Sequence, residues 1–445
     1  MASRDNFSGQ IGVVAAAAGS AIGLGNIWRF PYICGQNGGG AFLLVYLICV
    51  VLLGLPIILS EFSIGRSAQS NAYRAFKKLS PHTPWYLIGI IGIIAAFTII
   101  SFYSAVGGWT IEYIVRSFTN SMSANLSGEF KEFISGSYLP VIYQLLFLVL
   151  SLLIVMMGVQ KGIERSSKIL MPLLLLLLII LCVRSVTLPG ASEGLKFLLK
   201  PDFSKLTGNS ILLAMGQAFF SLSLGMGCMI TYGSYIKRKE NLTTSAVMIA
   251  GSDTLIALLA GVAIFPAAAA FHINPGSGPG LVFITLPEMF QQMRGGMIFS
   301  TFFFVLLCIA ALTSAISLIE VVVSFCVEEL RIKRRLATFL VGGCIFILGI
   351  LCSFSLGLLP GLKLFGLNFF DLMDFTSSNI LLPLGGFFTA VFLGWGLEKR
   401  ITVNELTNHD TIKFVGLRIF FFLIKFIIPV AILIVFISGL LQTGS

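Results

Sequence analysis

Long apolar segments separated by short polar ones recur along the whole chain. There are eleven of them, at residues 10–35, 40–66, 85–118, 138–159, 166–187, 209–235, 243–272, 297–328, 336–358, 372–397 and 413–441. A helix of about 20 apolar residues spans the hydrocarbon core of a bilayer. The pattern therefore predicts an all-α polytopic membrane protein, with about eleven transmembrane helices in a single domain over residues 1–441.

The composition agrees with this prediction. Of the 445 residues, 57% are hydrophobic and 11% are charged, whereas a soluble domain is about 25% charged. The eight Cys residues lie within or beside apolar segments and form no Cys-x-x-Cys pair, which argues against a disulfide framework or a structural metal site. The first apolar segment contains Asn26 and Arg29 and has no cleavage region, so we expect a retained helix and not a signal peptide.

The positive charge is unevenly distributed between the apolar segments. The net charge is +10, and basic clusters such as Lys237-Arg238-Lys239 lie in alternate connections. The positive-inside rule explains such clusters without a nucleic-acid partner. We therefore expect a lipid bilayer as the surroundings, with the N-terminus cytoplasmic and the C-terminus outside.

Two of the apolar segments contain a Gly-x-Gly in mid-membrane. Gly23 and Gly25 interrupt the first segment, and Gly225 and Gly227 interrupt the sixth. Glycine costs about 1 kcal/mol relative to alanine in a helix interior, and unwound backbone in a membrane is tolerated only where protein or a wet cavity surrounds it. Matching breaks in two halves mark a transporter site, whereas the alternative is close helix packing through small residues.

The motifs around these breaks resemble the neurotransmitter:sodium symporter family, and its bacterial LeuT-type members in particular. They are Gly23-Leu-Gly-Asn-Ile-Trp-Arg-Phe-Pro31, Asn37-Gly-Gly-Gly-Ala-Phe42, Glu61-Phe-Ser-Ile-Gly-Arg66, Gly216-Gln-Ala-Phe-Phe-Ser-Leu-Ser-Leu-Gly225 and Ala311-Leu-Thr-Ser314. The resemblance covers essentially the whole chain. It implies the LeuT-type fold with an inverted five-plus-five repeat, at residues 10–187 and 209–397, and an extra helix at 413–441. It also implies sodium-coupled symport by alternating access, without enzymatic chemistry, in the inner membrane of a bacterium.

The resemblance implies two sodium sites. The first would use the Ala21 carbonyl, the Asn26 side chain, Ser221, Asp253 and the substrate carboxylate. The second would use the carbonyls of Gly19, Ile22 and Ala310 and the hydroxyls of Thr313 and Ser314. Oxygen-only ligands suit a hard cation. For the two hydroxyls, hydrogen bonds to carbonyls one turn earlier are the alternative.

The resemblance also implies an amino acid substrate. Its carboxylate would meet the amides near Leu24 and Gly25 and the Tyr103 hydroxyl, and its amino group would meet carbonyls near Ala21, Phe220 and Ser223. Relatives that carry monoamines have an Asp where this chain has Gly23, so the substrate here should bring its own carboxylate. The side-chain pocket would be uncharged, which indicates hydrophobic amino acids, aromatic ones included; its lining would be Ile99, Tyr103, Phe220, Ser223, Met226, Ser314 and Leu318.

Ionisable and aromatic residues match the gates of the family. Arg29 and Asp374 match the outer gate pair, with Gln217 nearby and with Phe220 and Tyr103 closing the pocket beneath. The inner gate network would consist of Arg4, Phe7, Tyr235 and Glu328. The family usually has Trp in place of Phe7 and Asp in place of Glu328.

Two further features concern ion coupling. Chloride-dependent relatives have Asn in place of Asp253 and bind chloride with residues matching Tyr46, Gln217 and Ser221. We therefore expect chloride-independent transport. Proton binding to Asp253 on the return step is a further hypothesis. Gly162 and Pro172 match a Gly-x9-Pro motif whose unwinding would wet the second sodium site. The alternative for that motif is an ordinary helix start with a tolerated proline.

Other classes of function have less support in the sequence than symport. A membrane enzyme lacks support, since no Ser/His/Asp set, metal cluster or phosphate loop is recognisable and the three His residues lie near loops. An amino-acid sensor or a channel-like protein on the same fold stays open. The sequence leaves the preferred amino acid and the oligomeric state undetermined.

Overall fold

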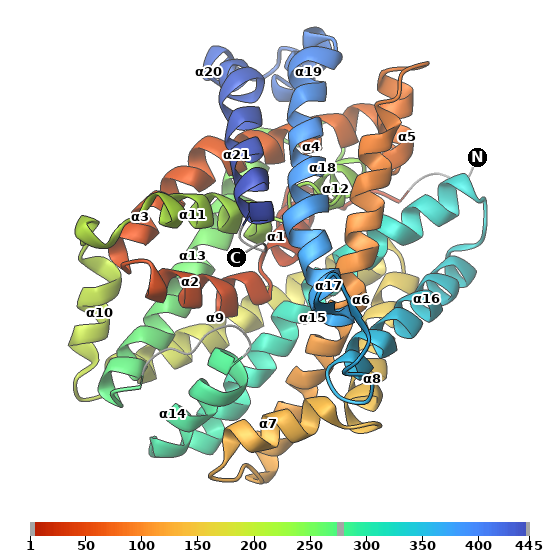
Figure 1. Cartoon of the computed structure of the whole chain (residues 1–445). Helices are drawn as coiled ribbons and strands as arrows, with labels where there is room; N and C mark the ends of the chain where they lie inside the picture. Colours follow the sequence, from red (N-terminus) through yellow and green to blue (C-terminus); the bar gives the residue numbers. More distant parts are fainter. Residues whose placement is uncertain (1–4, 274–279, 442–445) are drawn as a thin grey trace.

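The computed structural model describes residues 5–273 and 280–441, and nearly all of its regular structure is helical (Figure 1). One short antiparallel hairpin joins β1 (Lys363–Leu364) to β2 (Leu367–Asn368). The first half of the chain forms α1 (Gln10–Ala21), α2 (Phe30–Gln36), α3 (Gly40–Cys49), α4 (Leu55–Ala68), α5 (Ala72–Leu79), α6 (Tyr86–Thr119), α7 (Leu126–Ser135), α8 (Leu139–Met156), α9 (Arg165–Val186) and α10 (Ala191–Leu199).

The second half continues with shorter and longer helices in alternation. These are α11 (Gly208–Ser221), α12 (Cys228–Gly233), α13 (Leu242–Ala270), α14 (Leu286–Gln292), α15 (Gly296–Glu329), α16 (Arg334–Ser355), α17 (Phe369–Phe375), α18 (Leu382–Val391), α19 (Lys399–Leu406), α20 (Leu417–Phe422) and α21 (Ile428–Leu441). Turns of π-helix join several of them into longer spans, at Gly25–Arg29, Val50–Gly54, Val159–Glu164, Leu281–Thr285, Thr376–Leu381, Phe392–Gly396 and Leu423–Ile427.

Within the described residues, nine helical stretches are long and apolar enough to cross a membrane, by length and composition alone. A tenth is formed by α1 and the stretch Gly25–Gln36, which bend by 54° at their break. The count of eleven from the sequence is thus one higher. The difference is the predicted span 209–235, which the structure divides between α11 and α12, each too short to cross alone.

One predicted boundary is wrong by several residues. The fifth span was predicted to begin at residue 166, but its helix begins at Val159 with the π-helical turn. The polar pair Gln160-Lys161 is typical of a loop, which explains the error. The segment 274–279, in the glycine-rich connection before α14, lies outside the described residues. The boundaries of the two repeats stay a prediction.

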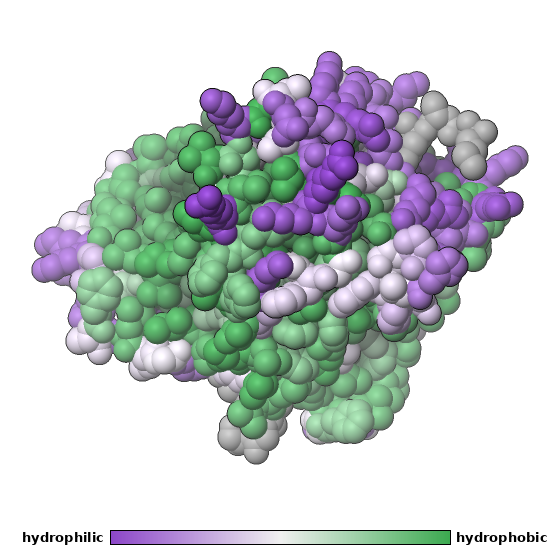
Figure 2. All heavy atoms as spheres, turned by 90° about the horizontal axis from the view of Figure 1, so that it is seen from above, coloured by the Kyte–Doolittle hydropathy of each residue, from purple (hydrophilic) through white to green (hydrophobic). Residues whose placement is uncertain are grey.

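The longest helices form the centre of the bundle. In the most apolar window of α15, 78% of the residues are buried, against 33% for α8, and Figure 1 shows α6 and α15 near the middle of the molecule. Apolar side chains cover much of the face in Figure 2, with hydrophilic side chains gathered to one side. Such a surface suits lipid contact for the outer helices. The central helix α15 instead packs against α1 and α12, which belong to the two interrupted segments.

Candidate functional site

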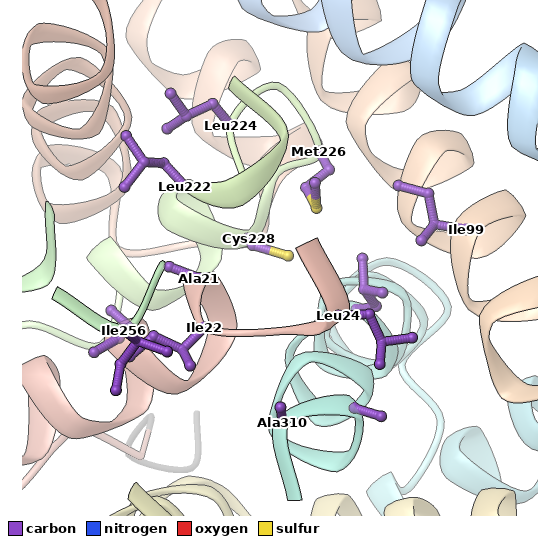
Figure 3. Close-up of a cluster of buried hydrophobic side chains, with 14 of the residues drawn as sticks. Ala21, Ile22, Leu24, Ile99, Leu222, Leu224, Met226, Cys228, Ile256 and Ala310 are labelled. Atoms are coloured by element: carbon purple, nitrogen blue, oxygen red, sulfur yellow. The ribbon is translucent and has the colours of Figure 1, made fainter. Parts of the chain in front are cut away.

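The first helix is broken where the sequence predicts it. α1 ends at Ala21, and Ile22 is extended, with φ −74° and ψ 96°. Helical structure resumes at Gly25, after Leu24. Figure 3 shows Ala21 and Ile22 on one side of the extended connection and Leu24 on the other. The Ile22 amide still makes a helical hydrogen bond, to the Ala18 carbonyl. The Gly23 and Leu24 amides instead donate to side chains, those of Asn26 and Tyr103.

The second break separates α11 from α12 and needs its glycines. Gly225 and Gly227 have φ values of +77° and +74°. A Cβ added at Gly225 would lie 2.4 Å from the Leu382 carbonyl oxygen, and the Gly225 amide donates to the Glu61 carboxylate at 2.8 Å. Glu61 is fully buried. A buried acid in an apolar segment is itself a functional signal, although Glu61 was predicted only as part of a family motif.

The two breaks face a common cavity with a volume of about 380 Å³. All twelve residues predicted to bind substrate line it, with the predicted sodium ligand Ser221 counted among them, together with Ser20, which was not predicted. The lining is Ser20, Ala21, Gly23, Leu24, Gly25, Ile99, Tyr103, Phe220, Ser221, Ser223, Met226, Ser314 and Leu318. None of these residues carries a charged side chain. The described structure therefore brings the predicted set together around an uncharged space.

Polar groups inside this cavity come from both breaks. The Leu24 amide donates to the Tyr103 hydroxyl at 3.3 Å, and the Ser223 hydroxyl donates to the Ser20 carbonyl at 2.9 Å. A Cβ added at Gly23 would lie 2.5 Å from Ser314 Oγ and 3.2 Å from the Tyr103 hydroxyl. The space that a side chain at position 23 would need is therefore already occupied.

Three candidate ligands of the first sodium site are close together. Asn26 Nδ2 donates to Asp253 Oδ1 at 2.7 Å and to the Asp253 carbonyl at 3.1 Å. The Tyr46 hydroxyl donates to Asp253 Oδ2 at 3.1 Å and lies 3.1 Å from Ser221 Oγ. Asn26 and Asp253 are fully buried. The Asn26 amide oxygen accepts from the Gly23 amide at 3.2 Å. The oxygen atoms of these side chains, a carboxylate, an amide and hydroxyls, are of the kinds that suit a hard cation.

The candidate ligands of the second sodium site join α1 to α15. The Ser314 hydroxyl lies 3.1 Å from the Ser20 carbonyl and 3.5 Å from the Ile22 carbonyl. The Thr313 hydroxyl donates to the carbonyls of Ile309 and Ala310, both at 3.1 Å. A Cβ added at Gly19 would lie 3.4 Å from Thr313 Cβ. Thr313 therefore makes the hydrogen bond within its own helix, whereas Ser314 reaches across to the break.

The outer gate residues surround the cavity from one end. The Arg29 guanidinium lies 4.6 Å from the centre of the Phe220 ring, and Gln217 Nε2 donates to the Gly25 carbonyl at 2.9 Å. Among the described residues no ion pair within 4.0 Å joins Arg29 to Asp374, and Asp374 instead accepts from Ser378 at 3.0 Å. The predicted gate pair is therefore not in direct contact here.

The inner gate residues form a ring and hydrogen-bond network. Phe7 is buried, packs edge-on against Tyr232 and Tyr235, and donates its amide to the Tyr235 carbonyl at 3.0 Å. The Tyr235 hydroxyl donates to Glu320 at 2.7 Å. Glu328 accepts from the Asn71 amide at 2.8 Å. Arg4 lies outside the described residues.

Two further charged residues of this network were missed by the sequence analysis. Glu320 is fully buried in α15 and forms an ion pair with Arg334 at the start of α16. Glu320 lies inside the predicted span 297–328, and an acid within a membrane span is a functional signal. That signal could have identified it, but its partner depends on how the two helices pack.

The two residues of the Gly-x9-Pro motif lie in different parts of the fifth span. Gly162 belongs to the π-helical turn and Pro172 lies inside α9. A Cβ at Gly162 would lie 2.0 Å from the Ile154 carbonyl oxygen. Turns of π-helix are often found at functional sites. The structure therefore places the motif on a helix with an irregular start.

Comparisons with known proteins agree on one family. A profile of the sodium:neurotransmitter symporter family matches residues 4–130 and 139–445. The uncharacterized sodium-dependent transporter YhdH of Bacillus subtilis is 44% identical over 97% of both chains, and one from Haemophilus influenzae is 39% identical over 98% of both. The crystal structure of MhsT in complex with L-phenylalanine matches with a TM-score of 0.90 and 47% identity, over 98% of this chain and all of that one. This chain therefore belongs to the sodium:neurotransmitter symporter family and has its LeuT-type fold.

Proposed function

We propose that the protein imports hydrophobic L-amino acids, aromatic ones included, by sodium-coupled symport with alternating access. The observation that carries the proposal is the uncharged cavity between the two breaks, in which Ser314 fills the space beside Gly23. A substrate without its own carboxylate would find no acidic partner there. A free amino acid carries that carboxylate itself.

The backbone of the first break would hold the carboxylate. The amides near Leu24 and Gly25 begin a helical stretch, where free N–H groups and the helix dipole favour an anion. The Tyr103 hydroxyl lies within hydrogen-bond distance of the Leu24 amide and would bind the same carboxylate. Carbonyls near Ala21, Phe220 and Ser223 would accept from the amino group.

The rest of the cavity would bind an apolar side chain. Ile99, Phe220, Met226 and Leu318 supply its apolar walls, and Met side chains can repack around ligands of different shape. The bound L-phenylalanine of the related MhsT structure supports an aromatic substrate.

Sodium would bind at two places and link substrate to the scaffold. The first site would combine Ala21, Asn26, Ser221 and Asp253 with the substrate carboxylate, so that cation and amino acid bind together. The second would combine Gly19, Ile22, Ala310, Thr313 and Ser314. Its ligands come from α1 and α15, so an ion there would stabilise α1 against the central helix.

Asp253 would make chloride unnecessary. Its carboxylate accepts from Asn26 and Tyr46, and Tyr46 also contacts Ser221. A fixed negative charge at this place would supply what a bound chloride supplies in chloride-dependent relatives. Proton binding to Asp253 in the empty carrier, and hence proton counter-transport, is part of the same proposal.

The test is uptake of labelled L-phenylalanine into proteoliposomes. An inward sodium gradient should drive accumulation above equilibrium, and equal sodium on both sides should abolish it. Unlabelled Leu, Tyr and Trp should compete, whereas Lys and Glu should not, because the cavity offers no counter-charge. Failure of the sodium gradient to drive accumulation of any hydrophobic amino acid would refute the proposal. Replacement of chloride by gluconate should leave the rate unchanged.

A further inference from the structure

The described N-terminal segment, residues 5–9, is tied to the start of α9. Ser8 donates its amide to Glu164 Oε2 at 2.8 Å, and its hydroxyl donates to Glu164 Oε1. Gln160 Nε2 donates to the Asn6 carbonyl at 2.7 Å. From a third element, Lys237 donates to the Ser8 carbonyl at 3.0 Å. The segment is thus held at Phe7 by Tyr235 and at its Asn6 and Ser8 by the fifth span.

Glu164 is the centre of these contacts. It lies on the last position of the π-helical turn, between Gly162 and Pro172, and is 3% exposed. Lys168, one turn further along α9, donates to Glu164 Oε1 at 2.6 Å. Both carboxylate oxygens are therefore paired, one of them with a charged donor. Such charge-assisted hydrogen bonds are stronger than neutral ones.

Gly12 in α1 leaves the space that this carboxylate occupies. A Cβ added at Gly12 would lie 2.3 Å from Glu164 Oε1 and 2.5 Å from its Cδ. The carboxylate thus rests directly on the α1 backbone at a point where only glycine leaves room. Glu164 consequently contacts α1 both at Ser8, before the helix, and at Gly12, inside it.

We propose that Glu164 is a positioning residue for transport, which couples movement of the N-terminal end of α1 to unwinding at the start of α9. One carboxylate joins both elements. Movement of the N-terminal end of α1 away from α9, or unwinding of the residues between Gly162 and Pro172, would separate Glu164 from Ser8 and Gly12. The inference rests on the proposed alternating-access function. It assigns to Glu164 the role of making the two movements, of α1 and of the start of α9, occur together when the cytoplasmic side opens.

Two buried cysteines of the chain allow this opening to be measured. Cys228 begins α12, is fully buried, and lies 3.9 Å from Ser317 Oγ; Figure 3 shows it beside the broken helices. Cys352 is equally buried but lies in α16. Alkylation of both by N-ethylmaleimide can be followed separately by peptide mass spectrometry, in full-length protein in liposomes with sodium present.

The test compares Gly12→Ala, Glu164→Ala and the double variant. Each single variant should raise the alkylation rate of Cys228 several-fold in sodium, and Cys352 should stay protected. The double variant should match Glu164→Ala, because the added methyl group meets the carboxylate only while Glu164 is present; contacting residues couple in this way. Glu112→Ala removes an ion pair of the same i,i+4 type, with Arg116, and should leave Cys228 protected.

Three results would overturn the inference. The first is an unchanged alkylation rate of Cys228 in both single variants, and the second is a double variant in which the two effects on that rate multiply. The third is a rise in the alkylation rates of both Cys228 and Cys352, which would assign the contact to stability of the whole fold. Uptake by the wild-type protein tests the proposed function separately. A protein that accumulated no amino acid would still give a readable alkylation comparison.

Discussion

The space beside Gly23 allows a quantitative test of substrate binding. In the variant Gly23→Ala, the new methyl group would start 2.5 Å from Ser314 Oγ, whereas ordinary contact begins at 3.4 Å. One of the two groups must therefore move by about 1 Å, at a cost typical of overpacking, roughly 1–3 kcal/mol. If the bound state bears that cost, the Kd for L-phenylalanine rises about 5- to 150-fold.

The assay is equilibrium binding of labelled L-phenylalanine to purified protein at saturating sodium. Ser314→Ala provides the matched variant, because it removes the hydroxyl and leaves Cβ at 3.4 Å from the added methyl group. Gly23→Ala should therefore cost less in the Ser314→Ala background than in the wild type. An unchanged Kd in Gly23→Ala, or a strictly additive double variant, would refute the argument that this contact shapes the site.

Three other predictions follow from the site. Asp253→Asn removes the fixed charge that Asn26 and Tyr46 contact, so uptake should become dependent on chloride; equal rates in chloride and gluconate would contradict this. Replacement of sodium by potassium should abolish binding of L-phenylalanine, because the substrate carboxylate loses its cation; binding retained in potassium would argue against the first sodium site. Gly225→Ala places a side chain at φ +77° and against the Leu382 carbonyl, so Tm in detergent should fall, by a strain of about 1–3 kcal/mol. Gly343→Ala, with open space around it, is the control and should leave Tm nearly unchanged.

The transmembrane spans were predictable because hydropathy is a local property. The boundaries of α6, α13 and α15 lie within about two residues of the predicted ones. The start of the fifth span was missed because its π-helical turn carries polar residues. The sixth segment was recognised as interrupted, but not as two helices that are each too short to span.

The partners of buried charges were less predictable. Glu320 lies in a predicted apolar segment and Arg334 in the basic connection that follows it, and nothing in their spacing shows that they pair. Arg29 and Asp374 were expected together, yet Arg29 lies over the Phe220 ring. Such contacts depend on the crossing and rotation of helices, which hydropathy does not record.

The sequence by itself determined that the chain spans a membrane, where its two helices break, and which residues resemble a substrate and sodium site. These inferences rest on local composition and short motifs. Only the tertiary structure decided that Ser314 occupies the space beside Gly23 and that Glu164 rests on Gly12. Both contacts join helices far apart in the chain, and their distances are decided by side-chain packing between those helices.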